Sequence, residues 1–378
     1  MNPVATTTEQ PAQAPAPTPG RNLARGVVGW SAVVAVAGGL LWWGISSGQC
    51  LQGAHAWSLA IVTGLTLGFL YALIALGYTM VYGVLQLINF AHSEVFMVGS
   101  FAGLYAISNI FGIGRTDAEP GVSGLLLIVV LVVGLVLAAL ASGGTAVAME
   151  RVAYRPLRRR GVPRLNYLIT AIGVSLFLSN LFQLLDGHKH LGLPFNWPGI
   201  AGKEALNYPN FLPKHPLFRL FGAPVTNQQV LIVVVAIVML IALDRFVNLT
   251  RTGQGIRALA EDPQTASLMG VNVDRTVVVT FFIGGLMAGV AGLLYGMYYE
   301  QAIFNMGFTP GIRAFTAAVL GGIGNIRGAM LGGVLLGLIE NMGAACTGTE
   351  WQPVIVFVVL VLVLLFRPTG LLGERVGA

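Results

Sequence analysis

Charged residues are scarce in this sequence. Asp, Glu, Lys and Arg make up 10% of the 378 residues and hydrophobic residues make up 55%, whereas a soluble globular domain carries about 25% charged residues. This deficit excludes an ordinary soluble enzyme and a disordered chain, and it also argues against a nucleic-acid binder despite the net charge of +6. Residues 1–25 are the exception, because they lack apolar periodicity and are predicted to form a disordered tail.

Cysteine and the common catalytic motifs are also scarce or missing. Cys50 and Cys346 are too few for a disulfide framework or a CxxC metal site, and no second His or Cys lies at ligand spacing from His92. The sequence contains no GxxxxGK[ST] loop and no HExxH motif. We therefore predict no catalytic residues, no metal site and no directly bound cofactor. If nucleotide drives this protein, another chain must bind it.

Long apolar runs are what the sequence has instead. Most approach the length of about 20 residues that a bilayer requires, and such segments must be helical because lipid offers no partner to backbone polar groups. We predict an all-α polytopic membrane protein with about 8–10 transmembrane helices and one transmembrane domain over residues 26–373. The first run could also be a cleaved signal, although its length favours a retained helix. The runs are Val27–Ile45, Trp57–Gly83, Phe90–Gly112, Gly124–Met149, Leu165–Leu185, Gln228–Leu243, Val277–Tyr299, Phe315–Met342 and Val354–Phe366.

Lysine and arginine positions predict the orientation, because cytoplasmic connections are enriched in both. With a cytoplasmic N-terminus and C-terminus, 14 of the 21 basic residues fall inside. Residues 248–276 then form a cytoplasmic loop, and 186–229 form an extracytoplasmic loop that is either a docking surface or a solvated cap. Both cysteines fall outside, so the topology allows a disulfide. Arg327 is unassigned, and the six basic residues outside are Arg115, Lys189, Lys203, Lys214, Arg219 and Arg313.

The cytoplasmic loop contains signals for a short helix. Asp262 is a suitable N-cap, Pro263 suits the first helical position, and Gly270 suits the residue after the helix. They predict a helix over Pro263–Met269 whose apolar surface comprises Ala266, Leu268 and Met269. Such a displayed helix either docks in a groove of another protein or lies on the lipid surface.

Three segments are candidates for lining a polar path. The stretch from Asn89 to Glu94 places ionisable groups at the edge of an apolar run, which suits a path but also suits a capped helix start. Glycines near residues 313–328 predict a broken or re-entrant helix, and their spacing also suits close helix packing. A carboxylate in the following helix either faces the path or pairs locally near the outer boundary. The candidates are Asn89, His92, Ser93, Glu94, Gly322, Gly324, Asn325 and Glu340.

Five segments together resemble the H-type permease subunit of branched-chain amino acid ABC importers, in the same order from about Trp57 to Gly373. The sequence departs from that pattern at Ser93, where glycine is usual, at Arg327, where a small residue or proline is common, and in its N-terminal extension. The segments are GLTLGFLYALIALGYTMVYG (64–83), INFAHSE (88–94), ERVAYRP (150–156), AEDPQTASLMG (260–270) and AFTAAVLGGIG (314–324).

The resemblance implies a half-channel in a bacterial plasma (inner) membrane. It implies a second permease subunit, two cytoplasmic ATPase subunits that bind ATP, and an extracytoplasmic solute-binding protein. The implied substrates are leucine, isoleucine and valine, and near relatives in the same family carry urea, short amides or other amino acids. The segment 261–270 resembles the ATPase-coupling helix, whose residues here are Glu261, Asp262, Pro263, Ala266 and Gly270.

Two other classes of protein compete with this interpretation. A secondary transporter or channel acting alone would need ion-coupling carboxylates inside the membrane, and Glu94 and Glu340 are the only candidates. A membrane enzyme would need a nucleophile beside a base, and no such pair can be placed. An importer subunit that depends on separate ATPases fits the sequence better than either.

Overall fold

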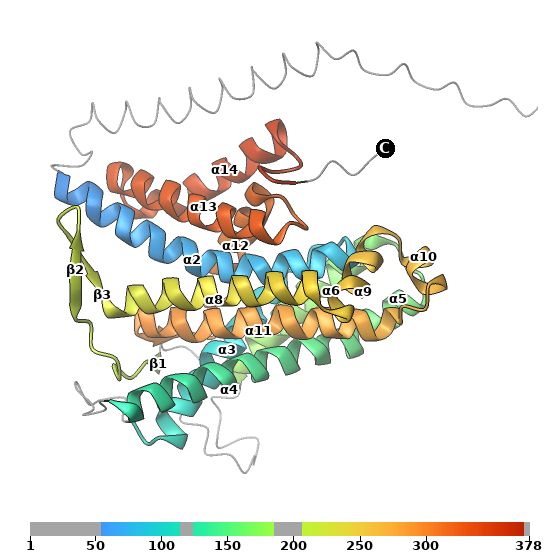
Figure 1. Cartoon of the computed structure of the whole chain (residues 1–378), viewed down its shortest axis with the longest axis horizontal. Helices are drawn as coiled ribbons and strands as arrows, with labels where there is room; N and C mark the ends of the chain where they lie inside the picture. Colours follow the sequence, from blue (N-terminus) through green and yellow to red (C-terminus); the bar gives the residue numbers. More distant parts are fainter. Residues whose placement is uncertain (1–53, 114–123, 185–205, 374–378) are drawn as a thin grey trace, which may run out of the picture.

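The structure is a computed structural model that describes residues 54–113, 124–184 and 206–373 of the chain (Figure 1). The predicted tail, the apolar run Val27–Ile45 and residues 186–205 of the long loop lie outside the described residues. Cys50 lies outside them as well, so the possible disulfide between Cys50 and Cys346 is not described. The side chain of Cys346 is buried.

The described residues form a bundle of long helices, which confirms the predicted all-α polytopic fold. Seven of the described helices are long and apolar enough to cross a membrane. Two helices are extended by a π-helical turn, η1 after α3 and η2 after α4. The helical elements are α2 (Ala54–Leu85), α3 (His92–Tyr105), η1 (Ala106–Ile110), α4 (Leu125–Met149), η2 (Glu150–Tyr154), α5 (Arg155–Arg159), α6 (Arg164–Leu184), α8 (Asn227–Leu249), α9 (Arg251–Glu261), α10 (Pro263–Leu268), α11 (Val273–Tyr299), α12 (Phe308–Gly321), α13 (Ile326–Thr347), η3 (Thr349–Trp351) and α14 (Gln352–Phe366).

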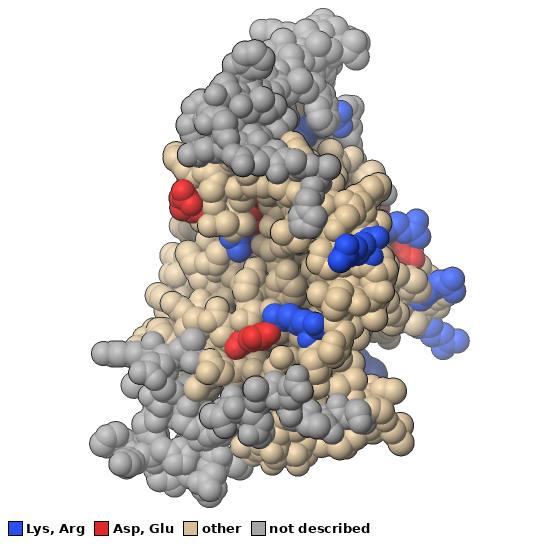
Figure 2. Space-filling model, turned by 90° about the vertical axis from the view of Figure 1, so that its left-hand side faces the viewer, with Lys and Arg blue, Asp and Glu red and all other residues tan. Residues whose placement is uncertain are grey.

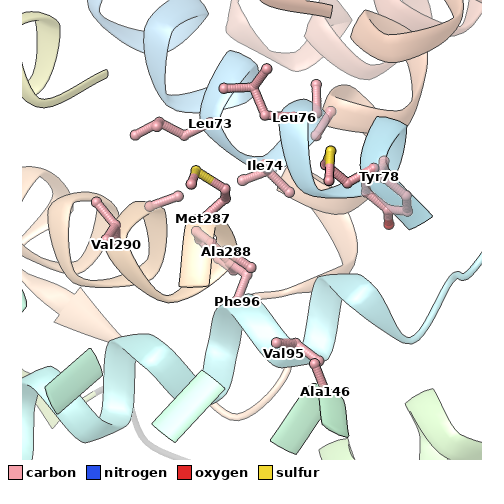
Figure 3. Packing of buried hydrophobic residues seen from close by; sticks show 14 of the residues in the cluster. Leu73, Ile74, Leu76, Tyr78, Val95, Phe96, Ala146, Met287, Ala288 and Val290 are labelled. Carbon is pink, nitrogen blue, oxygen red and sulfur yellow. The ribbon is translucent and has the colours of Figure 1, made fainter. Parts of the chain in front are cut away.

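Helices α2 and α11 form the centre of the bundle. Helices α12, α13 and α14 lie on one side of α2, and α3 and α4 pack against α11 (Figure 1). At the centre, Ile74 of α2, Phe96 of α3 and Ala288 of α11 are fully buried beside one another (Figure 3). Since α2 and α11 are apolar and mostly buried whereas α14 is apolar and mostly exposed, the outer helices supply the lipid-facing surface.

Four short strands accompany the helices, and the sequence interpretation did not anticipate them. β1 (Leu206–Asn207) pairs antiparallel with β4 (Gln301–Ala302), and β2 (Pro216–Leu220) forms a hairpin with β3 (Ala223–Thr226). The hairpin lies at one end of the bundle and α10 lies at the other (Figure 1). We refer to these as the hairpin end and the α10 end.

Charged side chains lie at both ends of the bundle. At the α10 end, Asp274 at the start of α11 accepts hydrogen bonds from Arg155 at 2.5 Å, Arg158 at 2.6 Å and Arg159 at 3.0 Å. The hairpin end, which faces the viewer in Figure 2, carries scattered charged side chains, among them the ion pair of Lys214 with Glu300. Arginines from which the count predicts a cytoplasmic side thus gather in an ion-pair cluster at the α10 end.

Glycines bring the backbones of α2 and α13 into direct contact. A methyl group added to Gly68 would lie 2.8 Å from the Cα of Val334, and one added to Gly333 would lie 2.6 Å from the Cα of Ala72. Real Cβ atoms do not approach backbone atoms this closely, so both positions require glycine. The glycine spacing in α13 therefore serves close helix packing.

We expect Gly333→Leu to reduce the yield of folded protein and its thermal stability. The side chain would separate α13 from α2, and overpacking of this kind costs roughly 1–3 kcal/mol or more. Gly144→Leu on α4 is the matched control, because that glycine is exposed and nothing lies within 4 Å of a Cβ built on it. The measurement is the monodisperse fraction and melting temperature of each variant in detergent. Equal values for the two variants would contradict the packing role.

Candidate functional site

The N-terminal ends of two helices lie close together, at a buried position for α3 and near the surface for α12, whose first residue Phe308 is 64% exposed. His92, the first residue of α3, lies with its ring against Gly77 of α2, which is about 12 Å along the helix from the end of α2. At the start of α12, a methyl group added to Gly307 would lie 3.0 Å from Glu94 Oε2. Helix N-terminal ends carry partial positive charge, and half-helices that meet within a membrane are typical of transporter solute sites.

A pocket lies beside this meeting point, and its empty volume of about 220 Å³ includes space open to solvent. It is lined by the second half of α2, the connection to α3, and α12. The ring of Tyr78 links the pocket to the meeting point, since its centroid is 4.8 Å from that of His92. The lining residues combine two tyrosines and one asparagine with apolar side chains; they are Tyr78, Tyr82, Leu87, Ile88, Asn89, Phe315, Ala318 and Ile323.

The predicted polar residues at the start of α3 are gathered at this place and are all buried. Asn89 lines the pocket, and its Oδ1 accepts a hydrogen bond of 2.7 Å from the Tyr154 hydroxyl of η2. Glu94 Oε1 accepts one of 3.2 Å from the Ser175 hydroxyl of α6. Two segments distant in sequence, η2 and α6, therefore hold side chains of this short stretch in place.

Some hydrogen-bonding capacity at the meeting point is unused. The Ser93 hydroxyl donates to the Phe90 carbonyl at 2.7 Å, as expected of a residue in the first turn of a helix. In contrast, Asn89 Nδ2, His92 Nε2 and Glu94 Oε2 are buried without a hydrogen-bond partner among the described residues. Buried polar atoms nearly always have partners, so these atoms are available to water or a solute. The Ser93 hydrogen bond fits a capped helix start, and the unpaired atoms support a polar path, so the two interpretations of this stretch are compatible.

The predicted break in the helix is present between α12 and α13. Gly322 has φ +108° and Gly324 has φ +98°, a region that favours glycine, and the isoleucine between them lines the pocket. Asn325 Oδ1 accepts from the Gly328 N–H at 2.9 Å and starts α13, while its Nδ2 donates to the Leu372 carbonyl at 2.8 Å. The break is thus fixed by the C-terminal segment and contributes one side chain to the pocket.

Glu340 is placed away from the pocket. It is fully buried in α13, and its Oε1 lies 2.7 Å from Nη2 of Arg313 on α12. Assigning Arg313 to an extracytoplasmic connection was therefore wrong. Helix α12 begins at Phe308, several residues before the apolar run at Phe315, and pairing with a carboxylate lets the guanidinium be buried within the helix.

Helix α10 forms where the caps predict it. Glu261 ends α9, Asp262 Oδ1 accepts from the Gln264 N–H at 2.9 Å, and Pro263 is the first helical residue. Hydrogen bonds from Thr265 and from backbone N–H groups lower the pKa of the Asp262 carboxyl below its usual value. The helix ends at Leu268, one residue earlier than predicted, and the following turn uses φ +86° at Gly270.

The exposed face of α10 differs from the predicted one at one residue. Ala266 is 4% exposed and packs inside the chain, whereas Leu268 is 87% and Met269 is 81% exposed. A charge at Ala266 would therefore disturb the fold itself, and it would not isolate a contact with a partner. The displayed apolar surface consists of Leu268 and Met269.

Several site residues were not singled out from the sequence. Tyr78, Tyr82, Phe315 and Ala318 line the pocket, yet in the sequence they are ordinary members of apolar runs. Nothing in a single sequence distinguishes them from residues that face lipid. The burial of Arg313 could have been predicted from the sequence, because a charged residue close to an apolar helix usually faces a partner inside the protein.

These features define a class of protein. The described residues form a multi-pass helical bundle in which the starts of α3 and α12 meet beside a pocket, and no cluster of His, Cys, Asp or Glu among them could hold a metal ion. This is the architecture of a membrane transport permease.

Comparison with known proteins gives the particular family. The family model for "branched-chain amino acid transport system / permease component" matches residues 60–364, and the chain belongs to this family. It is 43% identical to the Escherichia coli (strain K12) high-affinity branched-chain amino acid transport system permease protein LivH, over 82% of this chain and 94% of that protein. These matches confirm the resemblance that the motifs carried.

Two further relatives show the range of the similarity. The chain is 42% identical to the Pseudomonas aeruginosa (strain PAO1) high-affinity branched-chain amino acid transport system permease protein BraD, over 83% of this chain and 95% of that protein. It is 26% identical to the Escherichia coli (strain K12) xylose transport system permease protein XylH, over 58% of this chain and 57% of that protein. No solved structure matches the chain.

Proposed function

We propose that this chain is the permease subunit of an ATP-driven importer and forms part of the translocation path for branched-chain amino acids. The observation that carries the proposal is the meeting of the α3 and α12 starts beside a pocket, where buried polar atoms of Asn89, His92 and Glu94 have no partner among the described residues. The substrate class is supported by identity, which is 43% to LivH but 26% to the xylose permease. The chain itself is not an enzyme, and ATP is bound and hydrolysed by partner subunits.

The geometry supports a division of roles between the two ends. Under the proposal the α10 end, with its basic residues, faces the cytoplasm together with both chain termini. There Leu268 and Met269 contact an ATPase subunit. The hairpin end faces outward and receives solute from an extracytoplasmic binding protein. A second permease subunit completes the channel, so the assembly contains two permeases and two ATPases in a bacterial inner membrane.

Transport would follow from movement of helix groups around the pocket. ATP binding closes the ATPase pair, pushes on α9 and α10, and shifts the bundle between outward-open and inward-open states. Ile323, at the break between α12 and α13, lines the same pocket as Tyr82 near the end of α2. A shift of these helices relative to each other would therefore open or close the path there.

The test is ATP-dependent uptake into proteoliposomes that contain this chain with its partner subunits. Labelled leucine and labelled urea are compared, with and without the binding protein. We expect leucine uptake that requires both ATP and the binding protein. Uptake of urea in place of leucine would move the chain to an amide-carrying importer, and leucine uptake without any ATPase subunit would overturn the importer assignment.

A further inference from the structure

A buried cluster of opposite charges lies on α12 and α13, outside the pocket. Arg313 Nη2 and Glu340 Oε1 are 2.7 Å apart, and the Arg313 guanidinium carbon is 5.7 Å from the ring centroid of Tyr71 on α2. Tyr71 and Glu340 are fully buried and Arg313 is 9% exposed. Gln352 of α14 accepts a long hydrogen bond of 3.4 Å from Arg313. Four helices therefore converge on this one ion pair.

The cluster has more hydrogen-bonding capacity than its own residues use. Among the described residues, Arg313 Nε is buried without a hydrogen-bond partner, and beyond the ion pair the Glu340 carboxylate has only the Tyr71 hydroxyl as a partner. Unpaired polar atoms of this kind are rare and costly in a protein interior. The unused hydrogen-bonding capacity of this buried guanidinium and carboxylate indicates that the cluster binds another group during the working cycle.

The chemistry of that group follows from the charges. A guanidinium binds a carboxylate through two parallel hydrogen bonds, and a carboxylate accepts hydrogen bonds from an ammonium group. A zwitterionic α-amino acid carries both groups on one carbon atom, whereas a sugar or a neutral amide carries neither. If the ion pair opens and each half binds the opposite end of the zwitterion, no charge is left unpaired in the low-dielectric interior.

The cluster lies between the hairpin end and the pocket, so a solute entering from the hairpin end would meet the cluster first. Helix α2 starts at the hairpin end, where Val62 packs against Ala223 and Val225. Tyr71 and Tyr78 are seven residues apart on α2, so they share a face and are separated by about 10 Å along the axis. A solute that enters from the hairpin end therefore reaches the Arg313–Glu340 pair before it reaches the pocket lined by Tyr78.

We infer that Arg313, Glu340 and Tyr71 form a recognition site for the charged head group of an amino acid: Arg313 binds the α-carboxylate and Glu340 binds the α-ammonium. This inference rests on the proposed function and names the part of the solute that the permease itself recognises. The apolar side chain of the solute takes no part in this recognition.

The test separates recognition from a merely structural ion pair. The double variant R313M/E340L removes both charges but keeps similar volumes, so packing is retained and no charge is orphaned. We expect leucine uptake in proteoliposomes to fall by about ten- to hundred-fold, the range for lost hydrogen bonds to charged groups. ATP hydrolysis should still be stimulated by the binding protein, because assembly and coupling are intact.

The matched control removes another ion pair on the same helix. Arg327 of α13 pairs with Asp244 of α8 at 3.0 Å with its side chain largely exposed, so R327M/D244L should leave leucine uptake near the wild-type rate. Wild-type uptake by R313M/E340L would overturn the inference. If that variant fails to assemble, R313E/E340R keeps an ion pair with reversed charges; it should assemble and lose uptake, and retained uptake would overturn the inference.

The two proposals fail in different ways. If the wild-type assembly imports no amino acid, the proposed function fails. If it imports leucine and R313M/E340L does so equally well, the proposed function stands and the recognition site is refuted.

Discussion

Replacing Leu268 and Met269 together by glutamate is expected to abolish ATP-driven uptake while leaving the protein folded in the membrane. Both side chains are more than four-fifths exposed at the α10 end, so the substitution adds charge without disturbing the core. If they insert into an ATPase subunit, two carboxylates would be buried there without partners. Truncated or unpaired charges at interfaces cost about 2–5 kcal/mol each, which corresponds to loss of the complex at working concentrations.

The measurement is the amount of ATPase that co-purifies with the permease, together with leucine uptake. Phe221→Glu is the matched control, because Phe221 is an equally exposed apolar residue (79%) in the hairpin at the opposite end. That variant should keep its ATPase subunits. A double variant that retains the ATPase in full would refute the coupling role and favour α10 as a helix that lies on the lipid surface.

Replacing Glu340 alone by leucine is expected to be among the most destabilising single substitutions in the chain. Arg313 would remain buried in α12 with no carboxylate within reach, and removal of one partner of a buried ion pair costs about 3–5 kcal/mol. The reciprocal variant Arg313→Met leaves the fully buried Glu340 carboxylate unpaired and should behave similarly. Both should lower the melting temperature and the yield of assembled protein.

The double variant R313M/E340L is compared with the two single variants by its melting temperature. Because neither charge is then orphaned, its melting temperature in detergent should return to near that of the wild type. A melting temperature for Glu340→Leu that equals the wild-type value would contradict burial of the pair. A double variant that is as unstable as the sum of the singles would show that the two residues are not coupled.

The elements of the fold were largely predictable from local signals. Bilayer thickness fixes the length of apolar runs, and Leu125–Met149 of α4 differs from the predicted run by one residue at its start. The caps Asp262 and Gly270 act within one turn, so α10 was placed to within one residue at its end. The short strands were missed, because two- to five-residue strands leave little pattern in a proline-rich loop.

The candidate site was only partly predictable. Asn89, His92 and Glu94 were found because polar residues at the edge of an apolar run are conspicuous. Their place opposite the start of α12 was not, since 213 positions of chain separate Glu94 from Gly307. The pocket residues Phe315 and Ala318 carry no signal of their own.

The sequence by itself determined that this protein is a polytopic helical membrane protein, where the capped helix α10 lies, and which family the chain resembles. These properties depend on apolar length, capping and glycine backbone freedom, which act over one helix or less. Only the tertiary structure decided that α3 and α12 meet at a pocket, that Ala266 faces inward, and that Arg313 pairs with Glu340. Each of these depends on how helices distant in sequence pack against one another, and helix packing is set by the close approach of surfaces such as Gly68 and Gly333, which no local pattern specifies.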